Sequence, residues 1–259
     1  MNDELIAHYG TDRIEDTRLR RSPHGRLEFV RTQELLRRRL PATGLRILDV
    51  GGATGIHAGW LAADGHDVLL IDPVPTHVAA AAEIPGVTSQ LGDARSLDVP
   101  DRSADVVLLF GPLYHLTSAA DRAQALAEAV RALRPGGLLV AAGISRYLSL
   151  LEMGSNGRLG AEVEQSLQTA ISTGSYDGHV GFLSSHFHTA DSLVAELHSA
   201  GLPEVTVYGV EGPTWPALDT AGLSSFDELV DAAVRCARLV EQDPNVINMS
   251  AHFLAFAQT

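Results

Sequence analysis

The sequence predicts a doubly wound α/β domain, and three observations support that prediction. Short apolar runs alternate along the chain with segments whose apolar residues recur at helical spacing. The runs are apolar throughout, as in Val106-Val-Leu-Leu-Phe110 and Leu138-Leu-Val-Ala-Ala142, which is expected of parallel strands buried on both faces. A small-residue turn, Gly51-Gly-Ala-Thr-Gly55, follows the first run and leads directly into a helical pattern.

The individual elements follow in chain order. Apolar spacing over residues 25–40 predicts a helix that ends before Pro41. Strands are then expected at 45–50, 66–72, 87–91, 104–110 and 137–143. The helices between them are expected at 56–64, 74–82 and 119–133. Toward the C-terminus the pattern predicts helices at 191–200 and 226–240 and strands at 205–210 and 252–257.

Residues 145–189 interrupt this alternation. They are richer in Ser, Gly and His and carry one helical pattern, near residues 160–172. An excursion of this length inside an α/β domain is usually a lid or a substrate-binding cap. We therefore predict a helical segment at 1–40, an α/β core at 41–144 and 190–259, and an inserted cap at 145–189.

Composition excludes several classes of function. The chain has 259 residues, and its formal net charge of −13 disfavours a nucleic-acid partner, because such binding depends on neutralising phosphates. All 19 basic residues are arginine, which excludes a Schiff-base or P-loop lysine. The single cysteine, Cys236, excludes an internal disulfide and a cysteine-only zinc site. The sequence has neither a signal-peptide pattern nor an apolar run of the roughly 20 residues that cross a bilayer, so a cytoplasmic protein without a membrane partner is expected.

The turn at Gly51 predicts a ligand site. Small residues at this place leave backbone amides free to face a ligand. Asp72 follows Gly51 by about 20 residues, the distance at which an acid ending the second strand binds ribose hydroxyls. The two features together indicate an adenosine-containing cofactor. The turn does not fit the G-x-G-x-x-G pattern of nicotinamide and flavin folds, because Ala53 and Thr54 occupy the wrong positions.

The stretch Asp49-Val-Gly-Gly-Ala-Thr-Gly55 has the pattern D-x-G-x-A-x-G. It resembles the first motif of class I S-adenosylmethionine (SAM)-dependent methyltransferases, with Ala53 in place of the usual middle glycine. The resemblance continues in order through residues 41–143, at Gly92-Asp-Ala-Arg95, at Leu108-Leu-Phe-Gly-Pro-Leu-Tyr-His-Leu116 and at Leu133-Arg-Pro-Gly-Gly-Leu138. It implies a Rossmann-like fold whose seven-stranded sheet is mostly parallel with an antiparallel last strand. It also implies SAM as cofactor and S-adenosylhomocysteine as product.

The resemblance implies the cofactor site as well. Its candidates are Tyr9, Arg20, Asp49, Gly51, Gly52, Asp72, Pro73, Gly92, Asp93, Ala94, Phe110 and Gly111. Asp72 would bind the ribose, and the neighbourhood of Asp93 would bind the adenine amine. The N-terminal stretch resembles a bacterial subgroup with G-P-L-Y-H-L after strand four, in which this segment packs over the cofactor. Tyr9, Arg20 and Glu28 are therefore candidates for the methionine end, with Arg20 suited to the SAM carboxylate.

Simpler roles remain open for several of these residues. Asp49 could order its turn and do nothing else. Asp93 could cap a helix. The N-terminal segment could be held by packing alone.

The catalytic candidates follow the fourth strand. His115 lies immediately beyond this strand, where ligands bind in parallel sheets, and histidine titrates near neutrality, so it is a candidate general base. Tyr114 beside it is a candidate to orient the acceptor. The alternative is that His115 only anchors the loop. Gly111-Pro-Leu-Tyr114 lacks the leading acid or amide of the N/D-P-P-Y motif of amino-DNA methyltransferases, which also disfavours DNA as the acceptor.

Candidates for the acceptor pocket are Tyr147, Phe182, His186, His188 and Glu211. His186 and His188 share one face if this segment is extended. With Asp191 and His179 these histidines could form a metal site, but no further ligand cluster supports it, so no metal is predicted. For the aromatic residues, packing in the core is the alternative.

We therefore expect a methyltransferase that acts on an oxygen or nitrogen of a small molecule, in a setting such as specialised bacterial metabolism. Two rivals remain. One is a SAM-binding fold that catalyses a non-methylating reaction such as a cyclisation or isomerisation, and the other is a non-catalytic SAM-binding protein. A monomer and a homodimer are both compatible with the sequence.

Overall fold

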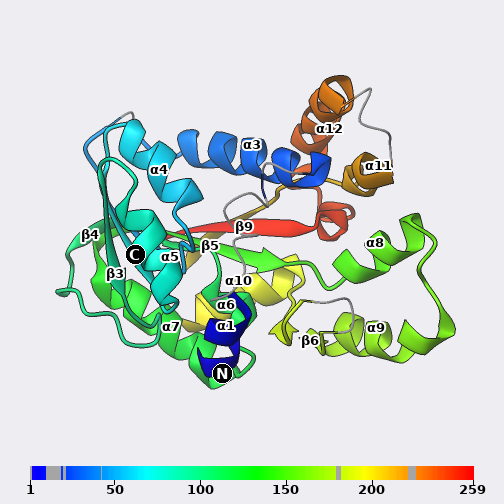
Figure 1. The fold of residues 1–259 in the computed structure, drawn as a ribbon, viewed down its shortest axis with the longest axis horizontal. Helices are drawn as coiled ribbons and strands as arrows, with labels where there is room; N and C mark the ends of the chain where they lie inside the picture. The colour runs from blue at the N-terminus through cyan, green and yellow to red at the C-terminus, as the bar shows by residue number, and fades with distance from the viewer. Residues whose placement is uncertain (1, 10–18, 20–21, 42, 179–181, 221–225) are drawn as a thin grey trace.

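The computed structural model describes residues 2–9, 19, 22–41, 43–178, 182–220 and 226–259. Its centre is a seven-stranded sheet with the strand order β3-β2-β1-β4-β5-β9-β8 (Figure 1). The strands are β1 (Arg46–Val50), β2 (Asp67–Asp72), β3 (Val87–Leu91), β4 (Ala104–Leu109), β5 (Leu133–Ile144), β8 (Glu204–Gly209) and β9 (His252–Gln258). The pairs among β1 to β5 are parallel, whereas β9 is antiparallel to both of its neighbours. The predicted fold class is confirmed.

Helices cover both faces of the sheet because the strand residues alternate between two apolar clusters. One cluster joins the sheet to α7 (Ala119–Ala132) and α10 (Ala190–Ser199), through residues such as Val107, Leu126 and Leu193. The other joins it to α3 (Pro23–Arg37), α4 (Ile56–Ala63) and α5 (Pro75–Ala82), through residues such as Leu36 and Leu61. The continuous apolar runs that suggested two-sided burial therefore have the expected cause.

Two further groups of helices pack beyond one end of the sheet. The helices α11 (Trp215–Thr220) and α12 (Phe226–Val240) pack on the start of α3 through a cluster around Trp215 and Leu27. Residues 145–189 hold α8 (Leu148–Ser155), α9 (Ala161–Thr173) and the paired strands β6 (Ser175–Tyr176) and β7 (Ser185–His186). Figure 1 shows α8 and α9 at the end of the molecule farthest from β3.

The short elements were not predicted. They are α6 (Pro112–His115), α8, α11, the β6–β7 pair and the 3-10 helix η2 (Ile247–Met249), whereas α1 (Asn2–Tyr9) lies within the predicted helical segment 1–40 without having been predicted separately. The strand β5 also begins at Leu133 instead of residue 137, so Arg134-Pro-Gly-Gly137 lies within it. A register shift between Ala104 and Val106 accompanies that extension, as expected where a bulge accommodates irregular backbone. Within the described part of the chain, no helix has the length and apolar character needed to span a membrane.

Candidate functional site

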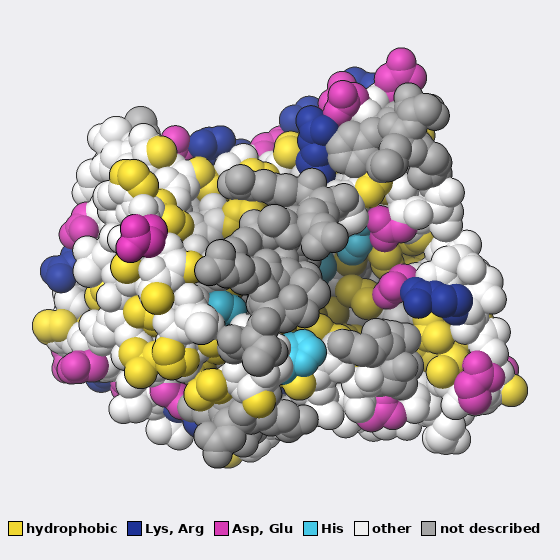
Figure 2. All heavy atoms as spheres, viewed as in Figure 1, with side chains coloured by type: hydrophobic (Ala, Val, Ile, Leu, Met, Phe, Trp, Pro, Cys, Tyr) yellow, Lys and Arg dark blue, Asp and Glu magenta, His cyan; other side chains and the backbone are white. Residues whose placement is uncertain are grey.

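A cavity of about 630 Å³ opens at the carboxyl ends of β1, β2 and β4. Its walls come from the turn after β1, the ends of β2 and β3, α6, and parts of α1, α3, α8, α11 and β9. Six histidines line it, namely His8, His24, His57, His77, His115 and His252. Figure 2 shows histidine side chains among apolar ones near the middle of one face of the molecule. The cavity thus combines apolar walls with several titratable groups.

The turn after β1 has room only for glycine at two positions. Gly51 has φ +74°, and a Cβ there would lie 2.8 Å from Cδ of Pro112. A Cβ on Gly52 would lie 2.6 Å from Oδ2 of Asp49. Both contacts are shorter than carbon and oxygen atoms tolerate, so the turn packs directly between β1 and α6. The bare backbone that results faces the cavity.

The Asp49 carboxyl lies beneath this turn and is fully buried. Burial and, secondarily, the nearby Asp72 charge raise the pKa of Asp49 from 3.8 to about 7, because both disfavour the ionised form. The amide of Ala58, in the first turn of α4, acts in the opposite direction, although its geometry falls short of a hydrogen bond. Asp49 therefore borders the cavity from below while it supports the turn.

Asp72 connects the end of β2 to the turn after β1. Its Oδ2 accepts a hydrogen bond from the Ala53 amide at 3.0 Å, and its Oδ1 accepts one from the Val74 amide at 2.9 Å. The Nδ1 atom of His77 lies 3.1 Å from the same Oδ1. A carboxylate offers about four acceptor sites, so a site on Oδ2 remains for a ribose hydroxyl. The sequence indicated only the ligand role, and the structure adds a structural one.

Asp93 orders a turn rather than a helix start. Its Oδ1 accepts from the Arg95 amide at 2.9 Å, and its Oδ2 lies 2.6 Å from Nη2 of the same arginine. Arg95 also bonds to Asp121 at 3.1 Å. No helix begins at residues 93–96, so the helix-cap alternative is wrong. Asp93 lines the cavity with Gly92 and Ala94.

The His115 ring lies in the cavity wall between α1 and the cap. Its Nε2 is 3.4 Å from the Tyr9 hydroxyl, and its ring centroid is 5.5 Å from that of Phe182. Burial lowers the pKa of His115 to about 4, against a weaker opposing effect of the Asp72 carboxylate, so the ring is neutral at pH 7. Tyr114 donates its hydroxyl proton to the Phe110 carbonyl at 2.7 Å, which closes the loop.

The structure brings most of the predicted site residues together. Those that line the cavity are Tyr9, Asp49, Gly51, Gly52, Asp72, Pro73, Gly92, Asp93, Ala94, Phe110, Gly111, Tyr114, His115 and Phe182. Arg20 and His179 lie outside the described residues. Tyr147, His186, His188 and Glu211 are not among the lining residues.

His186 and His188 instead belong to a cluster between β7 and α10. The Nε2 atom of the fully buried His188 lies 3.5 Å from Glu196, and that carboxylate binds Arg122 at 2.7 Å. Tyr147 precedes α8 as its N-cap. These placements do not support the acceptor-pocket roles that the sequence suggested, because none of the three residues is among those that line the cavity.

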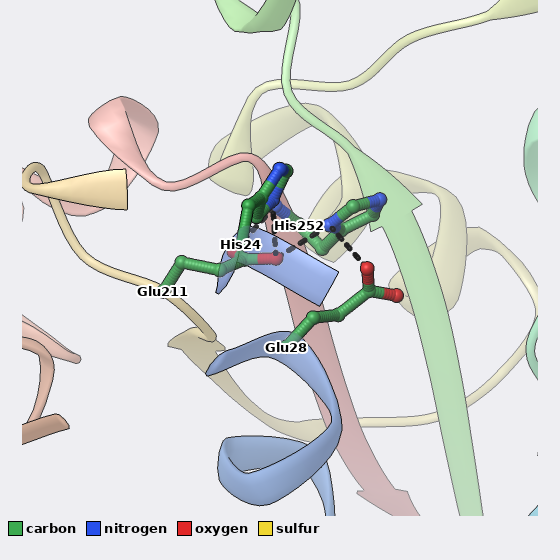
Figure 3. Close-up of side chains that lie close together, drawn as sticks. All are labelled: His24, Glu28, Glu211 and His252. Carbon is green, nitrogen blue, oxygen red and sulfur yellow. Dashed lines mark hydrogen bonds and ion pairs between the residues drawn. The ribbon is translucent and has the colours of Figure 1, made fainter. Parts of the chain in front are cut away.

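Glu211 belongs to a second cluster that the sequence did not predict, with His24, Glu28 and His252 (Figure 3). Glu211 is fully buried, with Nδ1 of His252 2.6 Å and Nε2 of His24 3.6 Å from its Oε1. The two histidines lower the pKa of Glu211 strongly against the effect of its burial. Contacts to Asp219 and Glu211 raise the pKa of His24 to about 10, although burial acts the other way.

The signal for this cluster was present but distributed. His24 and Glu28 are four residues apart, which places them on one face of α3. Glu211 follows the end of β8, and His252 begins β9 beside it. The pairing of β8 with β9 brings Glu211 to His252, and the packing of α3 beside them adds His24 and Glu28.

Comparison with known proteins agrees with this geometry. Residues 48–141 match the family model described as a methyltransferase domain. Over these residues the chain is similar to class I SAM-dependent methyltransferases, and SAM is the cofactor that this match supports. An uncharacterized methyltransferase of Mycobacterium tuberculosis is 38% identical over 101 residues. The match spans 39% of this chain and 40% of that relative.

Solved structures establish the fold over a longer stretch. A SAM-dependent methyltransferase of Thermotoga maritima, described as a possible histamine N-methyltransferase, has a TM-score of 0.61 at 18% identity and covers 98% of both chains. The cyclase SpnF has a TM-score of 0.54 at 20% identity, over 88% of this chain and 80% of that one. The same fold therefore supports chemistry other than methyl transfer.

The residues at the carboxyl end of the sheet fit SAM. The bare turn at Gly51 admits a ligand close to the backbone, and Asp72 retains an acceptor site for a ribose hydroxyl. The carboxyl groups of Asp49 and Asp72 suit a ligand with a positively charged sulfonium. The cofactor would bring an activated methyl group into the cavity.

Proposed function

We propose that the protein transfers a methyl group from SAM to an oxygen or nitrogen of a small organic molecule. The observation that supports this most directly is that one cavity includes both the cofactor turn and an apolar chamber beyond it. That chamber is lined by residues such as Phe182, Leu148, Tyr176 and Trp215. A cavity of about 630 Å³ is within the range of roughly 300–1,000 Å³ that small ligands occupy.

The demands on the protein are modest. The sulfonium methyl is already electrophilic, so the chain has to hold the acceptor in line with it and to exclude water. Leu148 of α8 and the aromatic ring of Phe182 line the cavity on the acceptor side. The cavity therefore favours positioning as the main contribution to rate.

His115 is the proposed proton acceptor. Its ring is neutral at pH 7, so Nδ1, a buried atom without a hydrogen-bond partner in the described structure, can accept a proton. A base whose pKa is about 4 is weak, but an alcohol oxygen becomes strongly acidic once the methyl group has begun to bond to it. A hydroxyl acceptor therefore suits His115 better than a protonated amine, which a weak base does not deprotonate.

The test is transfer of label from methyl-labelled SAM to a panel of hydroxyl-bearing and amine metabolites, with products identified by mass. Appearance of labelled product supports the proposal. The likeness to SpnF makes a cyclisation the second candidate. Binding of SAM, with an acceptor that changes structure but not mass, would favour that reaction instead.

A further inference from the structure

We propose that His24, His252 and Glu211, with Glu28 beside them, bind one divalent transition-metal ion, best matched by zinc. These four residues lie in and behind the wall of the cavity, on α3, after β8 and at the start of β9 (Figure 3). The existence of the metal site does not depend on methyl transfer. Its role in acceptor binding, argued below, rests on the proposed function.

The four ligand atoms are already close to the spacing that a metal requires. Each residue offers one atom, and all four atoms lie within 4.8 Å of one another. Nε2 of His24 is 3.6 Å from Oε1 of Glu211, and Nδ1 of His252 is 3.8 Å from Oε2 of Glu28. Tetrahedral ligands about 2.0–2.1 Å from zinc are separated from one another by about 3.3 Å. Shifts of a few tenths of an ångström therefore bring these pairs to coordination distance.

The Glu211 carboxylate is held in place for one ligand bond. Its Oε2 accepts hydrogen bonds from the Ser250 hydroxyl at 2.8 Å and from the His252 amide at 2.9 Å. These uncharged donors fix the carboxylate and leave Oε1 directed at the two histidines. The contact of 2.6 Å between Oε1 and Nδ1 of His252 is the one hydrogen bond that a metal ion would replace. Hydrogen bonds of this kind orient metal ligands and are nearly as important as the ligands.

His24 has the second partner that zinc-binding histidines usually have. Its Nε2 faces Glu211, whereas its Nδ1 lies 3.5 Å from Oδ2 of Asp219. A carboxylate on the far nitrogen fixes the ring and makes the near nitrogen a better ligand. The ring also packs on Trp215, with centroids 4.6 Å apart. His24 is thus oriented from two sides.

The helix that carries His24 and Glu28 is anchored on both sides of the cluster. The Ser22 side chain caps α3 by accepting from the Gly25 amide at 2.9 Å. One turn beyond Glu28, the fully buried Arg31 donates to the Val210 carbonyl at 3.2 Å, next to Glu211. The two halves of the site are therefore joined by a direct contact rather than by a loop.

Charge and ligand type select the metal. Once an ion displaces the extra proton of His24, two carboxylates with two metal-bound imidazoles carry a charge of −2, which a divalent ion balances. Magnesium and calcium prefer sites made entirely of oxygen, whereas imidazole nitrogen suits zinc and its neighbours in the first transition row. The His24, His252 and Glu211 combination is the His2Glu set of catalytic zinc, in which another position stays open.

With His24, His252 and Glu211 on the ion and Glu28 beside it, the fourth position stays open to water or substrate and would face the acceptor chamber. His24, Glu28 and His252 line the cavity, whereas Glu211 lies behind them. An ion held here can bind an oxygen of the acceptor, lower the pKa of its hydroxyl and orient it toward the methyl donor. This role would compensate for the weakness of His115 as a base.

The test is a direct measurement of metal content and affinity on the full chain, produced without a histidine tag. After dialysis against a chelator, zinc is titrated in competition with a chromophoric chelator, and cobalt is added separately to record the visible spectrum of the site. We expect one equivalent of zinc and the intense visible bands of four-coordinate cobalt. The Glu211→Gln variant should lose at least 100-fold in zinc affinity, and Asp219→Asn, on a half-exposed residue, about 10–100-fold.

Two control variants make the result specific. His198→Gln changes an exposed histidine and should leave stoichiometry and affinity unchanged. His186→Gln changes the other cluster of potential ligands, which also contains His188 and Glu196. This variant should leave zinc binding at the His24 site intact. Thermal unfolding and SAM calorimetry verify that each variant is folded.

Several outcomes would overturn the proposal. One is wild-type protein that binds no stoichiometric zinc or cobalt, in which case the four side chains form only an ion-pair network or bind an organic cation. Another is zinc affinity that survives both Glu211→Gln and Asp219→Asn, or that is lost only in His186→Gln. Because Asp219→Asn tests the same site at its surface, the proposal stays testable even if Glu211→Gln does not fold.

The metal site and the proposed function fail separately. Tight zinc binding without label transfer to any acceptor would leave the site standing and refute the methyltransferase proposal. Label transfer by metal-free protein at an undiminished rate would support the methyltransferase proposal and refute the role of the metal in acceptor binding.

Discussion

Asp72 shows how one side chain that serves the fold can also keep an acceptor site open for a ligand. Three protein groups already bond to its carboxylate, yet it ends β2 at the cavity wall. The sequence predicted its place correctly, because an acid that ends a buried strand has few other uses in this fold. It did not indicate the contact with the Ala53 amide, because that contact depends on how two separate turns pack.

Asp72→Ala should weaken SAM binding by more than 10-fold and also lower the melting temperature. The change removes a charged acceptor from the ribose site and leaves the amides of Ala53 and Val74 without their side-chain partner, each effect being of the order of 1–3 kcal/mol. Isothermal calorimetry and thermal unfolding measure the two effects. Asp67→Ala, at the exposed start of the same strand, is the control and should change neither. Unaltered SAM affinity in Asp72→Ala would contradict the ribose role.

Asp49 should make the protein less stable as pH rises. Its pKa is raised from 3.8 to about 7 in the folded state, so between these values the folded protein binds more protons than the unfolded chain. Stability contributed by the protonated carboxyl is therefore lost as pH increases from about 4 to 7, by at most about 4 kcal/mol.

Asp49→Asn should remove this dependence. We expect the variant, compared with wild type, to gain stability at pH 8 relative to pH 5, as measured by denaturant unfolding at both values. Asp67→Asn supplies the matched control at an exposed site. A difference between variant and wild type that stays constant with pH would show that Asp49 is ionised throughout.

His115→Gln should slow methyl transfer by about 100-fold or more and leave SAM affinity nearly unchanged, if His115 accepts the proton. Because the pKa of His115 is about 4, its titration should not change the wild-type rate near pH 6.5, where an ordinary histidine titrates. Label transfer as a function of pH measures both features. His198→Gln is the control on an exposed histidine. Full turnover in His115→Gln would leave His115 only the role of a loop anchor.

Among the elements, α6 depends on its contact with the turn after β1. Gly51→Ala places a Cβ 2.8 Å from Cδ of Pro112 at φ +74°, so it should cost stability through both strain and overlap. Gly136→Ala is the matched control, because it has the same φ of +74° with no atom within 4 Å.

The difference in the free energy of unfolding between these two variants isolates the cost of the overlap, which we expect to be about 1–3 kcal/mol. SAM affinity should fall only in Gly51→Ala. Urea unfolding and calorimetry give both values. Equal effects of the two substitutions would show that the close approach of α6 is not needed.

The elements differ in how fully the sequence determines them. The helix α12 has the bounds that its apolar spacing predicted, and the five parallel strands begin and end within a few residues of their apolar runs, apart from the earlier start of β5. Their patterns are strong because burial on defined faces fixes residue type. The four-residue α6 and the paired strands β6 and β7 are too short for any period to emerge. Their positions depend on packing against the cavity.

At the scale of the whole molecule, the sheet forms the end of the cavity that fits the cofactor, and the added segments form the end where we propose that the acceptor binds. Motif spacing could predict the first, because the turn after β1 and the ends of β2, β3 and β4 occur in chain order. The cluster of His24, Glu28, Glu211 and His252 could not be predicted in the same way, because its members are up to 228 positions apart (252 − 24). Insertion of β9 between β5 and β8 is what assembles it.

The packing of Trp215 against His24 has a practical consequence. The chain contains two tryptophans, and only Trp215 lies in the cavity wall, whereas Trp60 contacts Arg37 on the outer side of α4. A Trp60→Phe protein would keep a single indole fluorophore beside the acceptor chamber. Changes in its emission would report occupancy of that chamber in real time, so candidate acceptors could be screened optically before any reaction product is known.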